Sequence, residues 1–302
     1  MDWLGPVAVT PLAVYTGLSA VLLLLLVTAA ALARVQAAWV PVRTWLVMLP
    51  VALAALWLGP FAWGVFITLI SIFGFKEFAK ATGLYRELAF VAVVYLAIIG
   101  LNIMAFAHIY NVFMALPMWA IVLLALVPIA LNRVEGMLQW FSLAIVGVTF
   151  YAFFLAHLTW LAGTHAGLGY LLYVVLATQL NDILAFLFGK RFGRHHWTVL
   201  SPNKTVEGSV LALATTMLLT FAQAPIAFPH VPPWGVALAG LIVGVGGQVG
   251  DLTMAMVKRN IGIKDFGQLL PGHGGITDRV NSLMITAPIL AHAFGFLFGG
   301  FP

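Results

Sequence analysis

Charged residues concentrate in one short stretch of the sequence. Only 8% of the 302 residues are charged, yet the stretch from Asp251 to Asn281 holds one histidine, three acidic residues and four basic residues. These eight are Asp251, Lys258, Arg259, Lys264, Asp265, His273, Asp278 and Arg279, with five further glycines among them. Because charges are costly in so apolar a chain, their crowding requires partners of opposite charge. The stretch predicts a site for a nucleotide and a metal ion at a membrane face.

Two carboxylates lie inside apolar runs of the sequence. Asp182 precedes Gly189 by seven residues, and Asp251 precedes Lys258 by seven. At the helical rise, each lies about 10 Å from the end of its run. A lone charge at that depth costs at least about 2.5 kcal/mol, so each should face a partner or a wet cavity. With Glu207, which opens the run between them, they predict oxygen ligands for Mg²⁺. The alternative is a helix-packing ion pair with a nearby lysine or arginine.

The glycine-rich loop from Gly272 to Gly275 predicts a phosphate cradle. It leads into a helix that opens near Asp278, and backbone N–H groups before a helix N-terminus point at anions. His273 is suited to bind a phosphate oxygen or to shuttle a proton, although loop histidines and glycine pairs also occur in ordinary turns. Asp278 and Asn281 stand at i and i+3, so they share one helix face and can reach one ion.

The basic residues near these acids have two explanations. Any membrane protein uses lysine and arginine as anchors at its inner face. Their interleaving with acids and glycines instead favours phosphate binding, and for Lys258 and Arg259 the two explanations stand equal. The residues concerned are Lys204, Lys258, Arg259, Lys264 and Arg279.

Apolar helices are the elements that must position these residues. The chain is 63% hydrophobic with a mean hydropathy of +1.08, which predicts an all-α, polytopic membrane protein. It has no cysteine, which excludes disulfides and thiolate metal sites. The net charge of +5 suggests nucleic acid, but its placement between apolar runs argues for membrane lipids and against nucleic acid. We expect a single integral membrane domain, with helices of residues 1–165 as a scaffold and helices of residues 166–302 as the catalytic part.

Ten apolar runs approach the length of a membrane span. All 14 lysines and arginines lie in the odd-numbered connections between these runs. Under the positive-inside rule, the odd connections face the cytoplasm and both termini lie outside. The second to fourth runs are short, and a hairpin that fails to cross is an alternative at the break between Gly59 and Pro60. The runs lie near residues 12–33, 44–58, 60–75, 88–101, 112–131, 139–161, 167–189, 205–223, 234–257 and 280–299.

Several elements between about residues 180 and 282 resemble, in order, the motifs of the CDP-diacylglycerol synthase family, the phosphatidate cytidylyltransferases. Before residue 170 the likeness is limited to hydropathy and to Lys76-Glu77-Phe78. The elements are Asn181-Asp182 with Phe188-Gly189-Lys190, then Ser201-Pro202-Asn203-Lys204-Thr205-Val206-Glu207-Gly208, then Lys258-Arg259 with Lys264-Asp265, then Pro271-Gly272-His273-Gly274-Gly275, and finally Asp278-Arg279-Val280-Asn281.

The resemblance implies transfer of a cytidylyl group from CTP to phosphatidate, which yields CDP-diacylglycerol and pyrophosphate. It implies a homodimer and Mg²⁺ with room for a second, monovalent cation. From the resemblance together with the positive-inside rule, we expect a bacterial-type inner membrane and an active site that faces the cytoplasm. The implied metal ligands are Asp251, Asp278, Asn281 and Asp182. The implied catalytic residues are Asp251, Asp278, Lys264, Asp265, His273 and Arg279. The implied substrate contacts are Ser201, Lys204, Thr205, Glu207, Lys258, Arg259, Gly274 and Gly275.

Three positions depart from the family's pattern. Asn281 replaces the acid that closes the Asp-Arg-x-Asp element, Met254-Ala255 replaces Glu-Ser, and Asn203 replaces a lysine. These changes indicate a divergent paralogue. The alternatives are a non-catalytic protein that binds a nucleotide or phospholipid, and a cytidylyltransferase for a different lipid phosphate. A transporter of polar solutes has less support, since the ionisable residues cluster at the inner face instead of the midplane.

Overall fold

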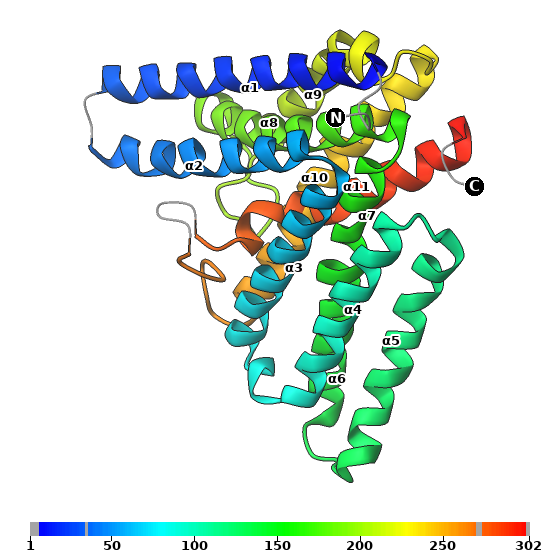
Figure 1. Ribbon diagram of the computed structural model, residues 1–302. Coiled ribbons are helices and arrows are strands. Elements are labelled where there is room, and N and C mark those ends of the chain that lie inside the picture. The colour runs from blue at the N-terminus through cyan, green and yellow to red at the C-terminus, as the bar shows by residue number, and fades with distance from the viewer. Residues whose placement is uncertain (1–5, 34–35, 270–273, 300–302) are drawn as a thin grey trace. The chain divides into compact units, whose positions relative to one another are not determined.

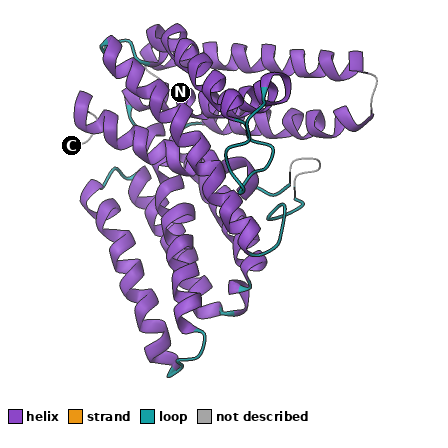
Figure 2. Cartoon of the chain, turned by 180° about the vertical axis from the view of Figure 1, so that it is seen from behind, coloured by secondary structure: helices purple, strands orange, loops and turns teal. Residues whose placement is uncertain are grey.

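A computed structural model describes residues 6–33, 36–269 and 274–299, which form ten helical rods (Figure 1). Figure 2 shows helices and loops, and His196 forms an isolated antiparallel β bridge with Thr205. The helices are α1 (Pro6–Ala33), α2 (Gln36–Leu58), α3 (Pro60–Thr82), the 3-10 helix η1 (Leu84–Arg86), α4 (Leu88–Phe106), α5 (Tyr110–Leu131), α6 (Met137–Val146), the π-helix η2 (Gly147–Phe154), α7 (Leu155–Ala162), α8 (His165–Phe192), α9 (Val206–Ala227), α10 (Pro233–Asn260) and α11 (Thr277–Phe298).

The predicted membrane class is confirmed. Among the described residues, eight helical segments are long and apolar enough to cross a membrane, and two shorter apolar stretches lie in α1 and α2. Each of the ten predicted apolar runs coincides with one helical rod, because α6, η2 and α7 form a single continuous rod. The protein is therefore a polytopic helical membrane protein.

Several helices extend beyond the apolar runs that predicted them. The prediction ends the third run at residue 75, whereas α3 continues to Thr82 and includes Lys76 and Lys80. Basic residues likewise occupy the last turns of α8 and α10. Apolar runs mark the part of a helix that meets hydrocarbon, and backbone hydrogen bonding continues past it, where the negative end of the helix dipole favours cations.

Packing divides the chain into two compact units. Unit 1 comprises Met1–Gly163 with Asp265–Arg279, and unit 2 comprises Thr164–Lys264 with Val280–Pro302. The segment 265–279 thus packs within unit 1, although it follows residue 166 in the sequence. The first turn of α11 belongs to unit 1 and its remainder to unit 2.

In unit 1, helices that follow one another in sequence pack side by side. α1 lies against α2, α2 against α3, α3 against α4 and α4 against α5 (Figure 1). Aromatic side chains fill the interior, where the Tyr151 ring lies 6.0 Å from Phe75 and 5.5 Å from Phe78, centroid to centroid. All three are fully buried, so this cluster fixes α3 against the rod that holds η2.

That rod contains an irregular winding. η2 is an eight-residue π-helix between α6 and α7, in which the backbone pairs i with i+5. It begins at Gly147, where a Cβ would lie 2.6 Å from the Phe75 ring. Tyr151 lies within η2, and its hydroxyl donates to Thr277 Oγ1 at 3.3 Å. The π-helix therefore positions a side chain that contacts the 265–279 segment of unit 1.

In unit 2, α8, α9 and α10 pack against one another through small residues. A Cβ at Gly208 would lie 2.7 Å from Gly189 Cα, so α8 and α9 meet backbone to backbone. A Cβ at Gly244 would lie 2.4 Å from the Leu213 side chain, so α10 meets α9 closely. Such contacts are typical of membrane helices, which associate by close packing instead of by the hydrophobic effect.

Candidate active site

A continuous chain of polar contacts crosses unit 2 between helices that are otherwise apolar. Lys204 Nζ lies 2.8 Å from Asp251 Oδ2. Asn281 Nδ2 donates to Asp251 Oδ1 at 2.9 Å, and Asn281 Oδ1 accepts from Ser282 N at 2.8 Å. Ser282 Oγ donates to Asp182 Oδ2 at 2.8 Å. This polar chain joins the segment before α9 to α10, α11 and α8, and it brings together Asp182, Lys204, Asp251 and Asn281 of the predicted site.

The turn that opens α9 holds Lys204 in place. The Lys204 N–H donates to Ser201 O at 2.9 Å. The next residue, Thr205, caps α9 because its hydroxyl accepts the Gly208 N–H at 3.2 Å. Ser201 and Thr205 thus orient the lysine through backbone contacts, and their predicted contacts with substrate stay predictions.

A glycine brings α10 and α11 together next to Asp251. A Cβ at Gly250 would lie 2.5 Å from Asn281 O and 2.8 Å from Ser282 Cα. The two backbones therefore meet here, and the short side chain of Asp251 reaches Asn281 directly. The spacing depends on the absence of a side chain at Gly250.

The ion pair at the centre of the polar chain is partly shielded from solvent. The exposed fraction is 16% for the Lys204 side chain and 31% for that of Asp251. Attraction between charges strengthens as the surroundings become less polar, so this pair is held more firmly than an exposed pair. Both groups nevertheless remain accessible enough to meet a ligand.

Two buried polar residues adjoin this chain without having been assigned a role from the sequence. Asn181 is fully buried, and its Oδ1 accepts from Thr216 Oγ1 at 3.1 Å. Among the described residues, Asn181 Nδ2 has no hydrogen-bond partner. Ser282, which links Asn281 to Asp182, is also fully buried. The available signal was local: each is a polar residue in an apolar run, next to a residue that the sequence did single out.

In unit 1, a second group of acids binds backbone N–H groups. Glu77 Oε2 accepts the Thr277 N–H at 3.0 Å. Asp278 Oδ2 accepts the N–H groups of Phe266 and Gly275, each at 3.0 Å. These bonds fasten the ends of the 265–277 segment to each other and to α3.

The glycines of that segment make room for these carboxylates. A Cβ at Gly267 would lie 2.5 Å from Glu77 Oε1, and a Cβ at Gly275 would lie 2.3 Å from Glu77 Oε2. Gly274 has φ +77°, and a Cβ there would approach Asp278 Oδ2 to 3.0 Å. Glu77 was missed as a site residue, although an acid at the end of an apolar run was visible in Lys76-Glu77-Phe78.

Contacts in unit 2 brace the loop before α9. Glu207 accepts the backbone N–H groups of Arg194 at 3.0 Å and His195 at 3.2 Å, and it also contacts the His195 ring. Arg259 Nε donates to Leu200 O at 3.3 Å. Both predicted substrate residues therefore hold backbone that leads to Lys204.

The remaining predicted residues are placed as follows. Lys264 and Asp265 are exposed, Lys258 lies in the last turn of α10, and Arg279 follows Asp278 in α11. His273, with Pro271 and Gly272, lies outside the described residues, so the predicted phosphate cradle is described only at Gly274 and Gly275. The Gly275 N–H donates to Asp278.

The surroundings of Asp251 do not fit a divalent cation as they stand. Mg²⁺ takes oxygen ligands, but Asn281 presents its nitrogen to Asp251, and both Asp251 oxygens already accept from Lys204 or Asn281. Among the described residues, no three histidine, aspartate or glutamate side chains are grouped for a metal ion. Asp278 belongs to unit 1, and the expectation that it shares an ion with Asp251 stays a prediction.

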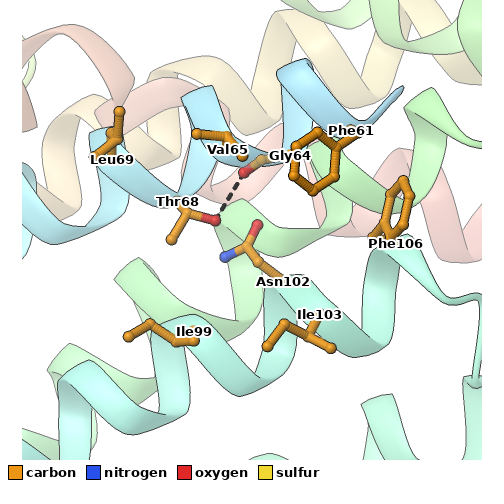
Figure 3. A pocket seen from close by; sticks show the side chains of 9 residues that line it. All are labelled: Phe61, Gly64, Val65, Thr68, Leu69, Ile99, Asn102, Ile103 and Phe106. Carbon is orange, nitrogen blue, oxygen red and sulfur yellow. Dashed lines mark hydrogen bonds between the residues drawn. The ribbon is translucent and has the colours of Figure 1, made fainter. Parts of the chain in front are cut away.

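Each unit carries an apolar groove. In unit 1, a groove of about 390 Å³ lies between α3 and α4. Figure 3 shows side chains that line it, among them Phe61, Val65 and Ile103. The Thr68 Oγ1 hydroxyl donates to Gly64 O at 2.7 Å. In unit 2, a groove of about 320 Å³ lies between α9 and α10. Val249 and Leu252, on either side of Asp251 in the sequence, line this second groove.

A family model and individual proteins of known sequence both relate this chain to cytidylyltransferases. Residues 39–297 match the model of a family described as the cytidylyltransferase family. The uncharacterized protein YnbB of Escherichia coli (strain K12) is 32% identical over 232 residues, which are 74% of this chain and 76% of that protein. Phosphatidate cytidylyltransferases of Staphylococcus haemolyticus (strain JCSC1435) and Staphylococcus aureus (strain COL) are 38% and 39% identical over 150 residues, 49% of this chain and 55% of each of those proteins. The chain thus spans about half the length of these two staphylococcal relatives.

Proposed function

Since the chain belongs to the cytidylyltransferase family, we propose that it transfers a cytidylyl group from CTP to a lipid phosphate, with phosphatidate as the default acceptor. The products are CDP-diacylglycerol and pyrophosphate. The observation that carries the proposal is the polar chain from Lys204 through Asp251 and Asn281 to Asp182, because so many polar groups inside apolar helices need a functional reason.

The reaction is a displacement at phosphorus. An oxygen of the lipid phosphate attacks the α-phosphorus of CTP and forms a new P–O bond, while the bond from the α-phosphorus to the bridging oxygen breaks and releases pyrophosphate. Both reactants are anions, so the barrier is mainly electrostatic, and cationic groups that hold attacker and leaving group in line lower it. No covalent bond to the protein is needed.

Lys204 is the side chain best suited to supply positive charge. Its ammonium group already makes a charge-assisted contact of 2.8 Å with Asp251, and a phosphate oxygen can replace that carboxylate with the same geometry. Asp251 then acts by holding the lysine in position before substrate arrives. Lys264 and Arg279 are proposed to neutralise the other phosphates. A role for Mg²⁺ stays a prediction from the resemblance.

The groove between α9 and α10 is suited to the acceptor's hydrocarbon chain. It is lined mainly by apolar side chains, and its residues Val206 and Leu252 lie close in sequence to Lys204 and Asp251. A lipid whose tail occupies this groove would bring its phosphate to the polar end of α9 and α10. Apolar walls do not select among acyl chains, so the acceptor is proposed as a lipid phosphate in general.

We place the active site at the cytoplasmic face of a bacterial-type inner membrane. Support comes from the 14 lysines and arginines, all of which lie in alternate connections between the apolar runs. CTP is a cytoplasmic nucleotide, so this orientation gives it access to Lys204. A homodimer stays a prediction.

The test uses purified protein, labelled CTP, Mg²⁺ and a panel of lipid phosphates that includes phosphatidate. We expect a labelled CDP-lipid and one pyrophosphate released for each lipid converted. A control enzyme of established phosphatidate cytidylyltransferase activity confirms that the lipids are presented correctly. Absence of any CDP-lipid across the panel, with the control active, would refute the proposal.

A second candidate is a non-catalytic protein that binds CTP or a lipid phosphate. One observation favours it: Met254 and Ala255 stand where the resemblance expects an acid and a hydroxyl, and both are buried apolar side chains of α10. This candidate predicts saturable CTP or phosphatidate binding without pyrophosphate release. A binding measurement and the pyrophosphate assay on the same preparation separate the two.

A further inference from the structure

The amide of Asn281 has only one orientation that suits both of its neighbours. The carboxylate of Asp251 accepts hydrogen bonds, so it requires the amide nitrogen, which lies 2.9 Å away. The backbone N–H of Ser282 donates, so it requires the amide oxygen, which lies 2.8 Å away. A flipped amide would set oxygen against carboxylate and N–H against N–H.

The charges around Asp251 already balance in this arrangement. One oxygen of Asp251 faces the ammonium group of Lys204, and the other faces the neutral amide of Asn281. The carboxylate therefore has one counter-ion and a hydrogen bond on each oxygen. The side chains of Lys204 and Asp251 are each less than one third exposed. The partners of Asp251 therefore replace much of the water that a free carboxylate would bind.

A carboxylate at position 281 would reverse this balance. It would place a second anionic oxygen where the amide nitrogen now lies, 2.9 Å from Asp251 Oδ1. Two carboxylates so close cannot both stay ionised without a cation or a shared proton between them. The neutral amide of Asn281 thus removes the need for a cation between positions 251 and 281.

We propose that Asn281 replaces a divalent cation at Asp251, so that the chain without nucleotide holds no resident metal ion there. Lys204 and the amide together complete the charge balance. The claim concerns the unliganded protein and goes beyond the proposed transfer reaction. It departs from the expectation that Asn281 is a metal ligand.

The test measures Mn²⁺ binding in the absence of nucleotide. Electron paramagnetic resonance detects the bound ion on the purified wild-type protein and on the Asn281→Asp variant. We expect Asn281→Asp to bind one Mn²⁺ per chain at least about tenfold more tightly than the wild type, because it adds a charged oxygen ligand. We also expect its melting temperature to fall in EDTA and to recover in Mn²⁺, while that of the wild type changes little. Equal Mn²⁺ affinity in the two proteins, at one ion per chain, would overturn the proposal.

Asn102→Asp is the matched control. Asn102 is a buried asparagine in unit 1 whose amide donates to Ile98 O at 2.9 Å and accepts from Thr159 Oγ1 at 2.6 Å. The change buries a carboxylate next to a hydroxyl and a carbonyl, so we expect a lower melting temperature that Mn²⁺ does not restore. Recovery of this variant to the same extent would attribute the effect to carboxylate burial in general and would overturn the proposal.

Lys204→Gln decides the matter if Asn281→Asp does not fold. It removes the counter-ion of Asp251 and leaves the amide of Asn281 in place. We expect tighter Mn²⁺ binding than in the wild type and a melting temperature that rises with Mn²⁺; no gain in either would overturn the proposal. None of these measurements uses CTP, so a failure of the transfer reaction leaves their outcome unaffected.

Discussion

Asp251 in unit 2 is held by a different kind of partner from Glu77 and Asp278 in unit 1. In unit 2, Asp251 is held by the side chains of Lys204 and Asn281. In unit 1, Glu77 and Asp278 are held by backbone N–H groups. A side chain can rotate to a ligand and return, whereas a backbone N–H group moves only when its segment does. The difference separates an acid poised for exchange from acids that fix a segment in place.

The largest expected effect is on turnover in Asp251→Asn. The change preserves shape but removes the charge that positions Lys204, so we expect CTP transfer to fall by about 100-fold or more, in the range of other electrostatic catalytic groups. The melting temperature should also fall, because the new amide offers one oxygen to two donors and leaves the Lys204 ammonium group without its counter-ion. Initial rates of pyrophosphate release and a melting curve, taken on the same preparation, measure both quantities.

Asp278 provides a sharper version of the comparison. In Asp278→Asn the amide oxygen can still accept the N–H groups of Phe266 and Gly275, so we expect the fold to persist. We expect turnover to be lost, because the resemblance implies a catalytic carboxylate at this position. Asp278→Ala should lose both, because two buried N–H groups are left without an acceptor. Equal turnover in the wild type, Asp278→Asn and Asn281→Asp would remove Asp278 from the catalytic site and leave it a structural acid.

Gly250→Ala should disturb the contact between Asp251 and Asn281 by moving the backbones of α10 and α11 apart. The added Cβ would meet Asn281 O at 2.5 Å, so α10 and α11 must separate, and we expect a loss of about 1–3 kcal/mol in stability. Gly17→Ala in α1 is the control, since a Cβ there meets nothing within 4 Å. Thermal unfolding compares the two. Equal stability of both variants would mean that the helices can separate without loss.

Glu77→Ala should have a smaller effect that is confined to stability. It leaves the Thr277 N–H without its acceptor, which costs about 1–3 kcal/mol, and it should loosen the 265–277 segment to proteolysis. Glu77→Gln keeps an acceptor and should lose less. Glu87→Ala breaks a bidentate ion pair with Arg133, whose side chain is 50% exposed, and should cost about 0.2–1 kcal/mol. If Glu87→Ala proved the more damaging, Glu77 would not anchor the segment.

The sequence predicted the helical rods because a long apolar run in a membrane satisfies its backbone hydrogen bonds by forming a helix. The helix ends were less accurate, as Lys76 and Lys258 show, since hydropathy does not report where backbone hydrogen bonding stops. Asp182 and Asp251 were predicted to need partners because an unpaired charge in an apolar helix is costly. In the structure, Asp251 pairs with Lys204 and Asp182 accepts a hydrogen bond from Ser282.

Specific partners were harder to predict. Glu77 and Thr277 are 200 residues apart, and no periodicity or motif spacing links them. The orientation of the Asn281 amide depends on its two neighbours, of which Asp251 comes from another helix. Such contacts depend on how the helices pack in three dimensions, so the spacing of residues in the sequence could not predict them.

The π-helix η2 is a point at which the rotation of the helical rod about its axis can change while its length stays nearly the same. Its i to i+5 pairing holds more residues per turn than an α-helix, so removal of one residue from Gly147–Phe154 would let the segment relax toward ordinary α-helical winding. In a uniform α-helix of 3.6 residues per turn, the loss of one residue rotates everything beyond it by about 100°. Here the change from π to α winding would offset part of that rotation. A deletion before Tyr151 would turn its hydroxyl away from Thr277 while the rod kept nearly its full length. The extra winding thus acts as a rotational adjustment built into a membrane-crossing helix.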